Sequence, residues 1–143
     1  IGDGPDRYNA ERLCRDLGVC SRVITLGKIR DAAKLMKLTD LFLLPSETES
    51  FGLAALEAMA EGIPVISSNT GGIPEVNKDG YSGYLSNVGD IEQMSKNAIK
   101  ILSDDDVLKK FKQNARAQSE LFSLEKILPI YEDIYTTVLE KAI

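Results

Sequence analysis

The sequence contains no histidine, and this absence excludes several classes of active site. A Ser-His-Asp triad, a cysteine nucleophile paired with histidine and a histidine-containing metal site cannot be built from this chain alone. Any proton transfer must therefore rest on aspartate, glutamate, lysine, tyrosine or cysteine side chains.

Cysteine is scarce: Cys14 and Cys20 are the only two, and their spacing is not that of a C-x-x-C motif. Two thiols in 143 residues do not make a disulfide scaffold, so we favour free thiols in a reducing cytoplasm. A bridge between the two stays open, because the sequence does not give their geometry.

Long apolar runs and an excess of basic residues are also missing. No run approaches the roughly 20 apolar residues of a membrane span, and the first residues carry no apolar leader. The 17 Lys and Arg against 22 Asp and Glu give a net charge of −5, with no basic stripe for nucleic acid. We therefore expect one cytoplasmic domain with neither a membrane span nor a nucleic-acid partner.

Short apolar runs alternate with helical patterns along most of the chain. The runs are continuous rather than alternating, which is typical of a parallel sheet covered on both faces; they lie at 23–27, 41–45, 64–68 and 83–86. Helical periods fill the intervening and following segments, at 5–17, 30–39, 51–61, 74–78, 90–102, 105–120 and 124–141. We predict an α/β fold, a Rossmann-like three-layer sandwich with a helical C-terminal tail.

The segment from Pro45 to Gly62 follows an apolar run and opens a helix. Ser50 is the predicted N-cap, and the first helical turn is then made of Phe51, Gly52 and Leu53. Unpaired backbone N–H groups and the helix dipole favour an anion such as a phosphate.

Two glutamates lie on either side of this turn. Glu49 precedes the predicted cap Ser50. Glu57 lies seven residues after Ser50, on the same face of the predicted helix and about 10 Å further along its axis. That distance suits a nucleoside diphosphate whose ribose hydroxyls reach Glu57. The alternative is that Glu49 is a solvated loop charge and Glu57 a surface residue in an ion pair.

Three further segments have a structural and a functional interpretation. Gly71–Glu75 is either a tight turn with a short helix or a second loop at the same site. Lys28 and Arg30 follow a predicted strand, where they are either ligand contacts or surface charges. Asp104–Asp106 resembles a metal motif, but its position before an amphipathic helix favours a helix start.

Taken together, these segments resemble the family-4 retaining glycosyltransferases of the GT-B fold. Glu49 to Glu57 is similar to their E-x7-E motif, and the surroundings agree at 2–5, 26–27, 45–46, 57–64 and 71–75. The resemblance runs through nearly the whole chain. It is greatest to the members that act in bacillithiol biosynthesis, although sucrose- and mannose-transferring members share most of the signature; the distinguishing stretches are 50–53, 71–76 and 83–90.

The resemblance implies a role for each matched residue. Glu49 would contact the donor sugar beside the reacting carbon and is the implied catalytic residue. Glu57 would bind the ribose, and the backbone near Lys28 would meet the uracil. The diphosphate or the sugar would be held by the backbone N–H groups of Ser50, Phe51, Gly52 and Leu53.

The implied reaction transfers a sugar from a UDP-sugar to a small acceptor hydroxyl, with retention at the anomeric carbon. In the bacillithiol branch the sugar is N-acetylglucosamine and the acceptor is L-malate. The leaving diphosphate would take the acceptor's proton, so the resemblance implies no protein nucleophile, no cofactor and no metal.

The chain departs from the family in what it lacks. An acceptor-binding N-terminal domain, the first strand of the C-terminal domain and the Arg/Lys pair that clamps the diphosphate are not in the sequence. We therefore expect 1–143 to be an incomplete C-terminal, donor-binding domain that is inactive alone. A non-catalytic nucleotide-binding module and another GT-B enzyme, such as a sugar-nucleotide epimerase, stay open as alternatives.

The last predicted helix carries an apolar stripe that the family would cover with its N-terminal domain. We expect this stripe to be exposed, or buried against a second copy in a homo-oligomer; it consists of Ile127, Ile130, Tyr131, Ile134, Tyr135, Val138 and Leu139.

Overall fold

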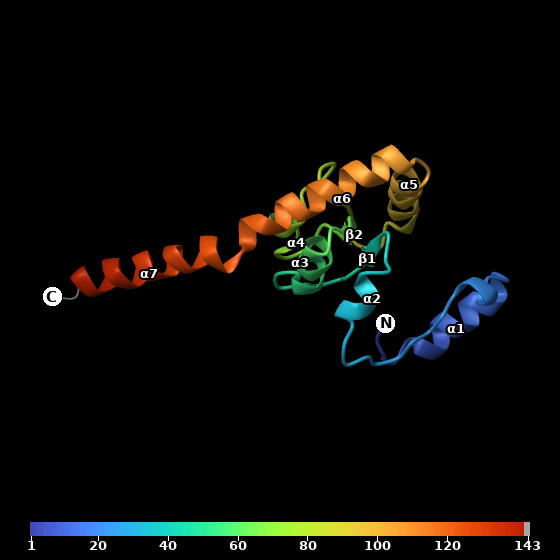
Figure 1. The fold of residues 1–143 in the computed structure, drawn as a ribbon. Helices are drawn as coiled ribbons and strands as arrows, with labels where there is room; N and C mark the ends of the chain where they lie inside the picture. Colours follow the sequence, from blue (N-terminus) through green and yellow to red (C-terminus); the bar gives the residue numbers. More distant parts are fainter. Residues whose placement is uncertain (142–143) are drawn as a thin grey trace. The chain divides into compact units, whose positions relative to one another are not determined.

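The computed structural model describes residues 1–141, which divide into two units, Ile1–Leu35 and Met36 onward. The first unit contains helix α1 (Arg7–Asp16) and the short 3-10 helix η1 (Cys20–Arg22), followed by a segment without regular secondary structure (Figure 1). Helix α2 (Ala33–Met36) leads the chain into the second unit, and it is much shorter than the helix predicted over 30–39.

The strand predicted at 23–27 is wrong, because this segment joins no sheet within residues 1–141. One backbone hydrogen bond reaches its end, from the N–H of Gly2 to the carbonyl of Gly27 at 2.8 Å. A strand exists only where a neighbouring strand pairs with its backbone groups. Apolar composition alone does not supply that neighbour.

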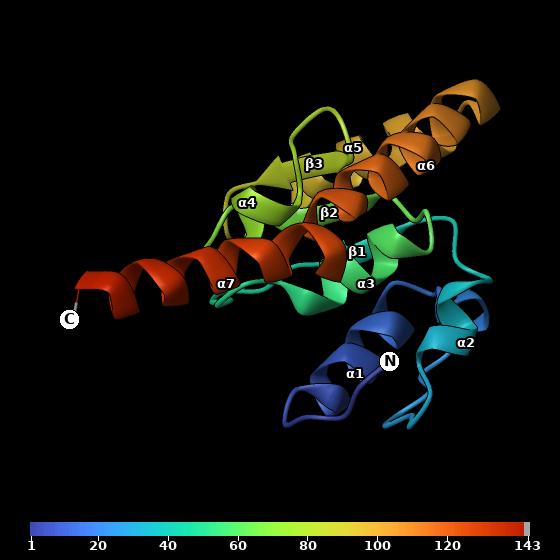
Figure 2. The ribbon, with the colours of Figure 1, turned by 60° about the vertical axis from the view of Figure 1, so that its left-hand side comes forward.

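The second unit is built on a three-stranded parallel sheet, as the continuous apolar runs predicted (Figure 2). Strands β1 (Phe42–Leu44), β2 (Val65–Ser68) and β3 (Gly83–Ser86) lie side by side in sequence order. In register, Phe42 is opposite Val65 and Val65 is opposite Gly83. The central strand β2 is buried along its whole length.

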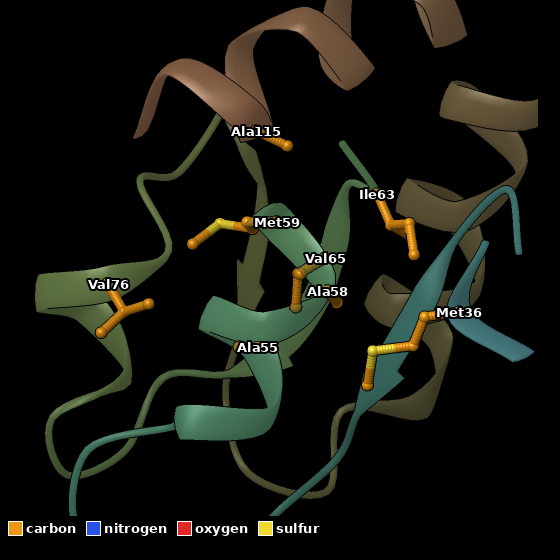
Figure 3. Close-up of a cluster of buried hydrophobic side chains, with 8 residues drawn as sticks. All are labelled: Met36, Ala55, Ala58, Met59, Ile63, Val65, Val76 and Ala115. Atoms are coloured by element: carbon orange, nitrogen blue, oxygen red, sulfur yellow. The ribbon is translucent and has the colours of Figure 1, made fainter. Parts of the chain in front are cut away.

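Helices cover both faces of this sheet, which confirms the predicted fold class. Helices α3 (Leu53–Ala60) and α4 (Ile73–Val76) pack with Val65 on one face, whereas α5 (Ile91–Leu102) packs with Ile66 on the other. Helix α6 (Asp105–Ser119) contributes to both cores. Figure 3 shows the core on the α3 face, made of Met36, Ala55, Ala58, Met59, Ile63, Val65, Val76 and Ala115.

The helix start predicted at Asp104–Asp106 is confirmed. The Asp104 side chain accepts hydrogen bonds from the backbone N–H groups of Asp106 and Val107, so it is the N-cap of α6.

The chain continues through the 3-10 helix η2 (Glu120–Phe122) into α7 (Leu124–Lys141), which Figure 1 shows running away from the sheet. The predicted apolar stripe is exposed over most of its length, as expected; the exposed members are Ile130, Tyr131, Ile134, Tyr135, Val138 and Leu139. A second copy that covers this stripe stays a prediction. Within residues 1–141, no helix has both the length and the apolar character needed to cross a bilayer.

A fully buried asparagine, Asn77, joins the end of α4 to two strands. Its side-chain nitrogen donates to the Ser67 hydroxyl at 2.8 Å and to the Val65 carbonyl at 3.1 Å. Its side-chain oxygen accepts from the Ser82 hydroxyl at 3.0 Å. These groups lie away from water, so the hydrogen bonds of Asn77 help to satisfy them, although the Ser82 hydroxyl also accepts from the backbone N–H of Lys78 at 2.8 Å.

We expect Asn77→Ala to lower the free energy of unfolding by about 2–4 kcal/mol, because it removes several buried hydrogen bonds at once. The matched control is Asn114→Ala, which removes a single, more exposed hydrogen bond to the Tyr81 carbonyl and should cost about 1 kcal/mol or less. Denaturant unfolding measures both variants. Equal losses in the two would mean that the buried network contributes little.

Candidate functional site

The candidate site lies where strands β1 and β2 end, at Leu44 and Ser68. Because the strands are parallel, both carboxyl ends meet at the same edge of the sheet. Two loops continue from this edge: 45–52, which leads into α3, and 69–72, which leads into α4. Ligands of open α/β sheets bind at this edge.

The two loops are in direct contact through their main chains. The N–H of Gly72 donates to the Glu49 carbonyl at 3.4 Å, and the Thr70 hydroxyl donates to the Glu47 carbonyl at 3.2 Å. A Cβ atom on Gly71 would lie 1.6 Å from the Glu49 carbonyl oxygen, so no other residue fits. The glycine pair therefore holds the Glu49 loop in place and is more than a tight turn.

The start of α3 differs from the prediction. Ser50 is not the N-cap: the helix begins at Leu53, and its N-cap is Gly52, which has a left-handed φ of 94°. That φ excludes Gly52 and the preceding Phe51 from the first helical turn. The N–H of Ser50 is already used, since it donates to the Glu49 carboxylate at 3.1 Å.

Among residues 1–141 no side chain caps this helix start, so the first turn still offers unpaired N–H groups. They belong to Leu53 and the two residues after it rather than to residues 51–53 as predicted. Pro74 and Glu75 lie in the first turn of α4, as the sequence predicted.

The two glutamates differ in environment. Glu49 is half-buried beside the glycine pair, whereas Glu57 is exposed on α3. Glu57 lies four residues after Leu53, on the same helix face and about 6 Å along the axis. Within residues 1–141 Glu57 has no salt-bridge partner, so the ion-pair interpretation is not supported.

The structure also brings a distant segment to this region, which sequence reasoning missed. The rings of Phe51 and Phe122 pack edge to face with centroids 5.9 Å apart. Beside them a hollow of about 390 Å³ is lined by Glu57, Arg116 and Ser119, among others. No local pattern links residues so far apart in the chain, so no sequence signal pointed to them.

Lys28 and Arg30 belong to the first unit. Their predicted contact with a nucleotide therefore stays a prediction.

The chain matches known proteins along most of its length. A family model described as "Glycosyl transferases group 1" matches residues 1–118. The N-acetyl-alpha-D-glucosaminyl L-malate synthase of Bacillus anthracis is 44% identical over 140 residues, which are 97% of this chain. The 2-deoxystreptamine N-acetyl-D-glucosaminyltransferase of Niallia circulans is 30% identical over 139 residues. The chain spans 37% and 36% of these two relatives' lengths.

Solved structures show the same fold. Sucrose-phosphate synthase from Thermosynechococcus elongatus is similar with a TM-score of 0.83 and 28% identity, over 98% of this chain and 37% of that one. HepE of Anabaena, solved in complex with UDP, has a TM-score of 0.80 and 26% identity, over 97% and 39%.

Replacement of Gly71 tests the contact between the two loops. Gly71→Ala places a methyl group against the Glu49 carbonyl, and we expect a loss of about 3 kcal/mol or more in the free energy of unfolding. Gly80→Ala is the matched control: its φ is also positive, at 69°, but no atom lies within 4 Å of the added Cβ. Thermal unfolding should show a small loss for Gly80→Ala, and equal losses would contradict the proposed packing.

Proposed function

The chain belongs to the group 1 glycosyltransferase family, and from this premise we propose that it is the donor-binding part of a retaining glycosyltransferase. The observation that carries the proposal is the uncapped start of α3 at Gly52, with exposed Glu57 one turn further on. Positive partial charge at the first turn suits a diphosphate, and a carboxylate that has no ion-pair partner in the described part of the chain suits the hydroxyls of a ribose.

Each residue of the site has a proposed part in binding the donor. The loop Ser50–Gly52 and the N–H groups from Leu53 onward hold the diphosphate and the sugar. Glu57 accepts hydrogen bonds from the ribose. The backbone near Lys28 meets the uracil. Glu49 contacts the sugar hydroxyls next to the carbon that reacts.

We propose that the donor is UDP-N-acetylglucosamine and that the acceptor is L-malate. Support comes from the relative at 44% identity, whose name states this sugar and this acceptor, and from the solved UDP complex of HepE. In this proposal the leaving diphosphate takes the proton of the acceptor hydroxyl and no protein nucleophile is needed, which suits a chain without histidine. N–H groups stabilise the charge that develops on the phosphate, and we expect no metal requirement.

Glu57→Gln tests the contact with the ribose. We expect UDP affinity to fall by about 1.5–3 kcal/mol, the typical value of a hydrogen bond to a charged group. Removal of a negative charge near a diphosphate would by itself strengthen binding, so a loss identifies a direct contact. Glu61→Gln removes the same charge one turn further along and should leave UDP affinity unchanged. Calorimetry with UDP measures both, and an unchanged affinity for Glu57→Gln would make Glu57 a structural residue.

Glu49→Gln tests the contact with the sugar. UDP affinity should barely change while the turnover of sugar transfer falls, because the interaction is made mainly in the transition state. Transfer is measured on the longest natural protein that contains this chain, with UDP-N-acetylglucosamine and a panel of acceptors that includes L-malate. Wild-type turnover in the variant would remove Glu49 from the reaction, and UDP release without any acceptor would favour an epimerase.

A further inference from the structure

The two cysteines lie outside the site described above, in the first unit. Cys14 is in the last turn of α1, and Cys20 opens η1. Between them the helix ends in a Schellman motif. The N–H of Gly18 donates to the Arg15 carbonyl at 3.0 Å, and the N–H of Val19 donates to the Cys14 carbonyl at 3.1 Å.

This motif reverses the direction of the chain. Gly18 has a φ of 67°, a conformation that glycine adopts without strain. The following residues therefore return along the last turn of α1, which brings Cys20 back to Cys14. The two cysteines line one hollow of about 210 Å³, together with Arg15.

The Cys20 side chain lies beside Cys14 in this hollow, and this neighbour raises the pKa of the Cys14 thiol. Arg15 acts in the opposite direction on the same thiol. Cys20 is exposed and Cys14 is half-buried. A reagent therefore reaches Cys20 first, and the neighbouring Cys14 thiol can then react with the modified Cys20 sulfur.

We propose that Cys14 and Cys20 form a thiol–disulfide exchange site whose oxidant is a low-molecular-weight disulfide. The Cys20 thiolate attacks one sulfur of the small disulfide, which forms a mixed disulfide and releases one small thiolate. The Cys14 thiolate then attacks the Cys20 sulfur, and the second small thiolate leaves. Two protein thiols are oxidised, one small disulfide is reduced to two thiols, and the two protons pass to solvent and the leaving thiolates.

The test uses the native, fully reduced protein with oxidised glutathione as the probe. Wild-type protein should lose two hydrogen masses and both free thiols, without accumulating a glutathione adduct. Dithiothreitol should restore both thiols. In denaturant the same protein should instead retain glutathione adducts, because the fold no longer holds the two cysteines close together. The readouts are intact mass and thiol counting.

Two variants separate the roles of the cysteines. Cys14→Ser should hold one glutathione on Cys20 as a stable adduct. Cys20→Ser should react about tenfold more slowly, because its remaining thiol is half-buried. Two glutathiones on the native wild-type protein, no reaction at all, or equal rates for both variants would each overturn the proposal. None of these outcomes depends on the donor site, so the proposal stands or falls independently of the proposed function.

Discussion

Close contact between two turns of main chain determines the geometry of the candidate site. Gly71 and Gly72 lie so near the Glu49 loop that neither has room for a side chain. This contact holds Glu49 beside the start of α4. At the start of α3, Gly52 takes a left-handed conformation because it has no side chain. The parallel sheet brings both loops to one edge, but the absence of side chains lets them touch.

Much of the fold could be predicted from the sequence, because its strands and helices satisfy local rules. The runs at 41–45, 64–68 and 83–86 became parallel strands, since each has a neighbour and both faces are covered. The run at 23–27 has the same composition but no partner strand in the described chain, so it failed as a strand. Composition predicts which segments can pair, and only the partner decides whether they do.

Only part of the candidate site could be predicted from the sequence. The sequence predicted the strand–loop–helix connection that holds Glu49 and Glu57, because both residues are local to it, whereas their part in binding stays a prediction. The N-cap was misplaced because Ser50 has a favourable side chain, whereas the backbone turn at Gly52 decides where the helix begins. Phe122 reaches Phe51 through tertiary packing, which no short-range pattern encodes.

Asn77 also has a consequence for the kinetics of folding. Its partners lie on β2, on β3 at the Tyr84 carbonyl and in the turn before β3, so its full set of hydrogen bonds needs both strands in place. Interactions that form after the rate-limiting step of folding act mainly on the rate of unfolding. We therefore expect the buried amide to act mainly on the rate of unfolding, since α4 and the glycine turn before it can leave the sheet only when this whole set of hydrogen bonds breaks.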